Sequence, residues 1–240
     1  MGYKDLHEQP FDEATISKLE IFEDYAQAWI PTFVMQKRFR EIHIFDFFAG
    51  TGYDKKGVPG SSIRFLRKIQ EQKEYLFKNK VRVILHLNEF EPNKREQKKF
   101  ELLKNSCSEF LKEDSGLLDR VEINYYNKDF EYLFSELYEI IRDFPSLVYL
   151  DQNGIKFLSE KYFLELEKTS QTDFLYFVSS SYFWRFGNSE EFKLHLDIDI
   201  EEAKKHGYKK IHRTITKELI KKLPNYSKLK LVLYNCNKLN

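Results

Sequence analysis

The chain has 240 residues, of which 42% are hydrophobic, 16% aromatic and 32% charged, and its formal net charge is +1. This composition excludes intrinsic disorder and low complexity, and the length favours one large domain over two small ones. Apolar runs such as residues 174–178 are too short for a membrane helix, and residues 1–10 contain no apolar signal core. Cys107 and Cys236 make neither a disulfide framework nor a metal cluster. We therefore expect a cytoplasmic protein with no membrane segment and no structural metal.

Much of the positive charge lies in residues 203–222, which contain eight basic residues and one acid. This segment has a net charge of +7, which leaves −6 for the rest of the chain. A basic stretch of this kind is typical of contact with DNA or RNA phosphates, and equally typical of a lysine-rich, solvated helix face. Both interpretations stay open.

The first part of the chain alternates helical and strand patterns. Apolar residues recur at three- and four-residue steps over residues 15–33, which predicts a helix. A short apolar strand follows at residues 42–48, a helix is then capped by Ser61 or Ser62, and a second strand spans residues 81–87. The region therefore has the pattern of a strand–helix–strand unit preceded by an extra helix.

The same alternation continues through the middle of the chain. A helix beginning near Pro92 has an apolar stripe that includes Cys107, which we expect to be a small core residue and not a nucleophile. A strand at residues 121–126, a regular amphipathic helix at residues 130–141 and a buried strand at residues 147–150 follow.

The last part of the chain adds a helix up to about Lys168 and strands at residues 174–178 and 229–234. Alternating strands and helices predict an α/β fold, a doubly wound and mostly parallel sheet of Rossmann-like type. We expect a helical extension at residues 1–40, packed on an α/β domain at residues 41–240 that carries an insertion at about residues 179–213. Folds of this type usually close with an antiparallel seventh strand, which the six predicted strands do not include.

Ligands of open α/β sheets bind outside the carboxyl ends of the strands, so the residues after each strand are the first candidates. After the first strand stand Asp46 and the turn formed by Ala49, Gly50, Thr51 and Gly52. Glycine allows a sharp turn and a close approach of the backbone to a ligand. The third glycine of a dinucleotide fingerprint is absent, and no Walker lysine follows.

Acidic residues follow the second and third strands. Glu89 stands where a carboxylate accepts ribose hydroxyls, whereas Glu91 better fits a carboxylate at a helix start. Asp129 has two interpretations, acceptance of a hydrogen bond from an adenine amine or capping of its own helix.

The order of glycine turn, acid and acid resembles the first three motifs of the class I S-adenosylmethionine (SAM) methyltransferases. Residues 45–52 resemble the cofactor loop of DNA methyltransferases, and residues 88–92 resemble their acid-x-x-Pro motif. The resemblance implies a SAM pocket in which Gly50 and Gly52 cradle the methionine portion, Glu89 holds the ribose and Asp129 the adenine.

A closer similarity, over about residues 10–180, is to the three-Cys-motif partner (TcmP) family. It rests on residues 15–18, Tyr25, Trp29, 47–54, Gly57, Gly60, Ser61 and 147–154. This resemblance implies a methyltransferase-like fold, a SAM pocket and a separate cysteine-motif partner protein.

The chain departs from both families after its fourth strand. Their Asp-Pro-aromatic element is replaced by Asp151, Gln152, Asn153 and Gly154. The resemblance implies that the first three of these orient the methyl acceptor, but the aromatic residue that would stack on a base is missing.

Aromatic residues after the fifth strand are candidates to replace the missing stacking residue. Tyr182, Trp184 and Arg185 have the chemistry to stack on and hold a flipped base or a single strand, and the alternative is an aromatic plug on the core. Asp197 and Asp199 alternate with apolar residues, which predicts a surface strand.

Three functions remain in contention. The first is a SAM-dependent methyltransferase that acts on nucleic acid, or on a nucleic-acid-associated substrate, with a partner protein. The second is a catalytically inactive binding subunit of a phage-defence or mobile-element complex. The third, an NAD-type Rossmann enzyme, is disfavoured by the incomplete glycine fingerprint.

Overall fold

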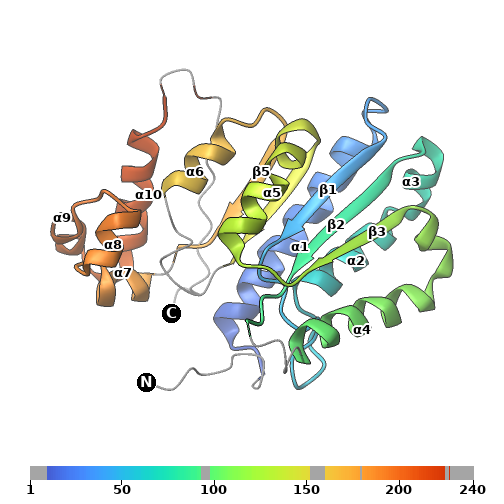
Figure 1. Cartoon of the computed structure of the whole chain (residues 1–240), viewed down its shortest axis with the longest axis horizontal. Helices are drawn as coiled ribbons and strands as arrows, with labels where there is room; N and C mark the ends of the chain where they lie inside the picture. The colour runs from blue at the N-terminus through green and yellow to red at the C-terminus, as the bar shows by residue number, and fades with distance from the viewer. Residues whose placement is uncertain (1–9, 93–97, 152–159, 179, 225–226, 228–240) are drawn as a thin grey trace. The chain divides into compact units, whose positions relative to one another are not determined.

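A computed structural model describes residues 10–92, 98–151, 160–178, 180–224 and 227 (Figure 1). The described chain forms two compact units. The first contains the residues up to Tyr149 together with Gln171–Leu175, and the second contains Leu150–Ser170 and the segment from Tyr176 onward.

A five-stranded, all-parallel sheet has the strand order β3-β2-β1-β4-β5. Its strands are β1 (Glu41–Asp46), β2 (Arg82–Asn88), β3 (Val121–Tyr126), β4 (Ser146–Leu150) and β5 (Thr172–Tyr176). The predicted Rossmann-like α/β fold is therefore confirmed, and each of these strands lies within two residues of its predicted position. The sixth predicted strand, at residues 229–234, lies outside the described residues.

In the residues that the structure describes before β3, four helices and a short 3-10 turn contribute to the first unit. They are α1 (Glu13–Val34), α2 (Ser61–Glu71), α3 (Lys73–Asn79), α4 (Lys98–Glu113) and η2 (Ser115–Asp119). Their apolar faces form one core cluster with alternate strand residues such as Ile42, Ile44 and Val83. Cys107 is fully buried in this cluster, as predicted, and burial raises the pKa of its thiol to about 12. A reactive thiolate is thereby excluded at neutral pH.

Helix α5 (Phe130–Asp143) covers the opposite face of the sheet, in front of the strands in Figure 1. Its regular stripe places Phe130 and Phe134 against Phe47, with ring centroids 5.1 and 5.9 Å apart. Helices on both faces make the sheet doubly wound. The strand order reverses between β1 and β4, and ligands of such sheets bind at the carboxyl ends next to this switch point.

The described part of the second unit contains several short helices. These are α6 (Glu160–Glu167), α7 (Ser180–Phe186), α8 (Glu190–His195), α9 (Ile200–Lys205), η3 (Tyr208–Lys210) and α10 (Ile211–Lys221). Buried Phe183 and Phe192 meet edge to face, with ring centroids 5.1 Å apart.

The predicted surface strand around Asp197 and Asp199 is wrong. Asp199 is the N-cap of α9, and its Oδ1 accepts a hydrogen bond from the Glu202 N–H at 3.0 Å. Asp197 lies in the connection between α8 and α9. A capping aspartate outweighs a short apolar–polar alternation, because it satisfies a backbone donor at the positive end of the helix. The two glutamates in the first turn of α9 favour the same helix start.

Candidate functional site

Asp46 ends β1 and fixes the turn that follows. Its fully buried carboxylate accepts hydrogen bonds from Ser61 Oγ at 2.5 Å and from the Phe48 N–H at 3.1 Å. The first contact ties the strand end to the beginning of α2, and the second closes the chain on itself. We therefore assign Asp46 a positioning role behind the turn.

The turn itself requires glycine. Gly50 and Gly52 have φ angles of +66° and +91°, a region that residues with a Cβ rarely adopt. A Cβ on Gly52 would lie 2.6 Å from the Cβ of Ser106 on α4. Ser106 Oγ also donates a hydrogen bond to the Thr51 carbonyl at 3.0 Å, so α4 packs directly on the turn.

Glu89 meets this turn from the neighbouring strand. Its Oε2 accepts a hydrogen bond from the Gly50 N–H at 2.9 Å. Strands β1 and β2 are paired up to Asp46 and Leu87, so their carboxyl ends leave the sheet side by side. The structure thus joins two of the predicted cofactor-binding elements at one edge.

The carboxylate of Glu91 binds the start of α4. Its carboxylate accepts a hydrogen bond from the Phe100 N–H of α4 at 2.9 Å, which is the helix-start role expected for it. Its own N–H donates to Asn127 Oδ1 at 2.8 Å, so the segments that follow β2 and β3 are also bound to each other.

Asn88 is a buried residue that the sequence did not single out. Its Nδ2 donates to the carbonyls of Phe47 and Lys128, each at 3.1 Å, and its Oδ1 accepts from the Lys128 N–H at 3.1 Å. The Ala49 N–H donates to the Asn88 carbonyl at 2.9 Å. One amide side chain therefore holds together the segments that follow β1, β2 and β3. In the sequence, the feature that could have indicated this role of Asn88 is its position as a polar residue at the end of an apolar strand.

Asp129 caps α5. Its Oδ1 accepts a hydrogen bond from the Glu131 N–H at 3.0 Å, as in one of its two interpretations. Capping places the Asp129 carboxylate at the carboxyl end of β3, directly after Lys128. The backbone N–H of Lys128 is in turn held by Asn88 Oδ1.

The predicted acceptor residue Asp151 belongs to the second unit. Asp151 directly follows β4 and is half-buried, whereas Gln152 and Asn153 lie outside the described residues. Trp184 and Arg185 are exposed on α7, and the Tyr182 side chain lies outside the described part. Among the aromatic side chains of this segment that the structure describes, Phe183 is buried, whereas Trp184 and Phe186 are exposed.

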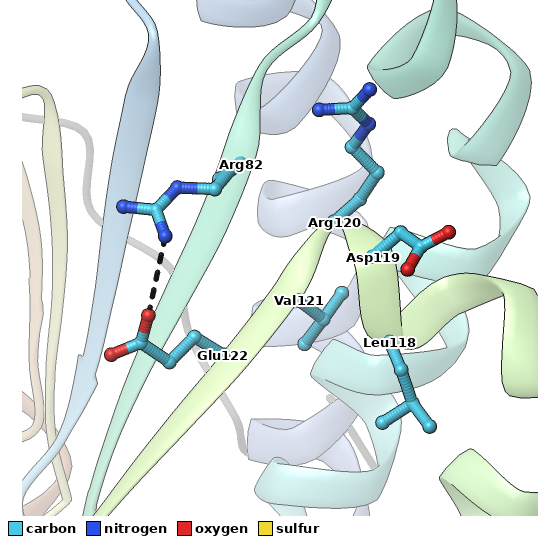
Figure 2. Close-up of a pocket in the computed structure, with 6 residues that line it drawn as sticks. All are labelled: Arg82, Leu118, Asp119, Arg120, Val121 and Glu122. Carbon is cyan, nitrogen blue, oxygen red and sulfur yellow. Dashed lines mark hydrogen bonds and ion pairs between the residues drawn. The ribbon is translucent and has the colours of Figure 1, made fainter.

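A hollow at the opposite end of the sheet is a less suitable site. It is lined by Arg82, Leu118, Asp119, Arg120, Val121 and Glu122, as Figure 2 shows. Arg82 there pairs with Glu41 at 2.8 Å and with Glu122 at 3.4 Å. These residues lie at the amino ends of the strands, away from the edge where such sheets bind ligands.

A buried histidine pair lies within the sheet. His43 Nδ1 of β1 and His86 Nε2 of β2 are 3.0 Å apart, and His86 Nδ1 is 3.0 Å from the Tyr126 hydroxyl of β3. Burial lowers both histidine pKa values, and it lowers that of His86 to about 3. Both rings are therefore neutral near pH 7 and serve as a structural polar chain across three strands.

The described residues contain no helix that is long and apolar enough to cross a bilayer. Within the same ranges, no group of three or more His, Cys, Asp or Glu side chains is placed to hold a metal ion. No protein-family model matches the chain, and no curated protein matches its sequence. The glycine turn and the residues around it are therefore the features of this chain that point to a function.

Proposed function

We propose that this protein is a SAM-dependent methyltransferase that acts on nucleic acid, or on a nucleic-acid-associated substrate, together with a separate cysteine-motif partner protein. The observation that carries the proposal is the hydrogen bond between the Gly50 N–H and Glu89 Oε2 at 2.9 Å. It brings a glycine turn and an acid together at the sheet edge where nucleoside ligands bind in this architecture.

The residues at this edge fit the parts of SAM. Gly50 and Gly52 expose backbone without a Cβ, which suits the methionine portion. A carboxylate accepts hydrogen bonds at both oxygens, which is the chemistry that two ribose hydroxyls require, and Glu89 stands at the sheet edge beside the Gly50 N–H. The capping carboxylate of Asp129, after the next strand, suits the adenine amine.

Bound SAM supplies a methyl group already activated by its sulfonium. The protein then has to hold donor and acceptor in line, because positioning provides most of the rate enhancement in such a transfer. In this proposal Asp151 orients the acceptor, with Gln152 and Asn153 as further hydrogen-bonding groups.

The alternative is a catalytically inactive binding subunit of a phage-defence or mobile-element complex. It is favoured by one observation, the replacement of the Asp-Pro-aromatic element by Asp151, Gln152 and Asn153. The two functions differ in whether the protein transfers the methyl group of bound SAM to a substrate. SAM binding without methylation of DNA, RNA or the partner protein would support the alternative.

Calorimetric titration with SAM tests the pocket. We expect Glu89→Gln to weaken binding by about 10- to 150-fold, because a charge-assisted hydrogen bond contributes about 1.5–3 kcal/mol. The substitution keeps an oxygen that accepts from the Gly50 N–H, so the turn is preserved. The matched control is Glu91→Gln, two residues away, which should change the affinity by less than about 2-fold.

An absence of heat from the unsubstituted protein would remove the SAM assignment. Equal affinities of the Glu89→Gln and Glu91→Gln variants would instead remove Glu89 from the site. A parallel titration with NADH should give no heat, and heat there would favour the NAD-type enzyme.

A further inference from the structure

The structure describes the side chains of seven of the eight basic residues of segment 203–222, and these seven divide into two groups. Four are held in ion pairs within the second unit, namely Lys204 with Glu201, Lys205 with Glu202, Lys221 with Glu218, and Lys222 with Glu160 and Asp197. Within the described part of the chain, Lys210, Arg213 and Lys217 form no such pair with a carboxylate. Their charge is therefore not compensated locally.

These three cations lie in a row. Lys210 is the N-cap of α10, and Arg213 and Lys217 follow at steps of three and four residues. Residues at these steps share one helix face, with about 5–6 Å between their Cβ atoms. The buried residues of α10, Ile211, Ile215, Thr216 and Leu219, face the interior of the unit. The row is thus a solvent-facing line of positive charge.

Two exposed aromatic rings lie next to the start of this row. Trp184 of α7 is 39% exposed and Tyr208 of η3 is 48% exposed. Their ring centroids are 5.9 Å apart, in an edge-to-face arrangement. Tyr208 precedes Lys210 by two residues, and Arg185, also exposed, follows Trp184.

We propose that this face binds a single-stranded nucleic acid. The aromatic–basic face is defined as Trp184, Arg185, Tyr208, Lys210, Arg213 and Lys217. Phosphates would lie along the cationic row, and unpaired bases would stack on Trp184 and Tyr208. Stacking on aromatic side chains tolerates any base and contributes about 1–3 kcal/mol per base. A duplex keeps its bases stacked inside, so it would use the cations but not the rings.

The inference names single-stranded nucleic acid as the substrate class of the proposed function, and in this respect it rests on that function. It uses only residues of the second unit, however, and needs no cofactor. If SAM gives no heat but the oligonucleotide still binds, the result contradicts the proposed function alone. If SAM binds but the oligonucleotide does not, the result contradicts this inference alone.

The test is fluorescence anisotropy of a labelled 20-nucleotide oligothymidylate between 50 and 200 mM salt. We expect Trp184→Ala to weaken binding by about 5- to 150-fold, with an unchanged salt slope. Arg213→Ala/Lys217→Ala should reduce the slope of log affinity against log salt by about 1.4, because each lost phosphate contact contributes about 0.7. An oligouridylate should behave in the same way, and a duplex of equal length should bind more weakly.

The matched control is Lys204→Ala/Lys205→Ala, which removes the same charge from α9, where both lysines are paired with glutamates. Its salt slope should stay within about 0.3 of the unsubstituted value. An equal slope change in the two double variants would overturn the proposal, as would tighter binding of the duplex.

Intrinsic fluorescence gives a second readout, since the chain has two tryptophans and Trp29 is buried in the first unit. Oligothymidylate should quench the emission of the unsubstituted protein. The quenching should disappear in Trp184→Phe, while that variant keeps an aromatic ring and binds within a few-fold. Unchanged quenching in Trp184→Phe would contradict stacking at this residue.

Discussion

Replacement of Gly52 by alanine is expected to lower the free energy of unfolding by about 2–6 kcal/mol and to abolish SAM binding. Two costs add in this variant. The φ angle of +91° strains any residue with a Cβ by about 1–3 kcal/mol. The new methyl group would also lie 2.6 Å from the Cβ of Ser106, and overpacking of this kind costs about 1–3 kcal/mol. Urea unfolding measures the combined loss in the free energy of unfolding.

Gly57 provides the matched control for the Gly52 substitution. Its φ angle is +77°, and no atom lies within 4 Å of the position its Cβ would take. Gly57→Ala should therefore show the backbone strain alone, and the difference between the two variants isolates the contact with α4. Equal destabilisation of the two single variants would show that α4 does not pack tightly on the turn.

Acidification from pH 7 to 4.5 is expected to lower the free energy of unfolding through the pair His43 and His86. Burial lowers both pKa values in the folded state, to about 3 for His86, whereas an unfolded histidine titrates near its usual pKa of about 6.5. Below about pH 6.5 the unfolded chain therefore binds more protons than the folded chain. Stability falls by up to about 1.4 kcal/mol per pH unit for each histidine.

The double variant His43→Leu/His86→Leu tests this assignment. It removes both partners of the 3.0 Å contact, so no buried ring nitrogen of the pair is left without its neighbour. Its free energy of unfolding, measured with urea at each pH, should change much less over the same range. His212, whose pKa burial also lowers, remains and should supply a smaller slope. An unchanged pH dependence in the double variant would contradict the account of the pair.

The sequence predicted the elements whose hydrophobic period is strong. The stripe of α5 and the apolar strands β1 and β2 were recognisable because one buried face imposes a period of 3.6 or an unbroken apolar run. Glu89 was predictable for a different reason. Parallel strands end at a common edge, so a residue after β2 must lie near the turn after β1.

Contacts that depend on register or on helix packing were not predictable. The proximity of Gly52 to Ser106 needs the placement of α4 on the turn, and the His43–His86 pair needs the exact pairing of two strands. Asp199 shows the opposite failure. A short alternation imitated a strand, where a capping aspartate in fact begins a helix.

Selective ¹⁵N-glycine labelling tests the SAM pocket most directly, because the chain has only nine glycines and a SAM titration then reports binding and location together. The Gly50 amide donates to Glu89, and Gly52 follows in the same turn, whereas Gly116 lies in η2, before β3. We predict that SAM shifts the amide resonances of Gly50 and Gly52 and leaves that of Gly116 in place. Unmoved Gly50 and Gly52 resonances at saturating SAM would contradict the account.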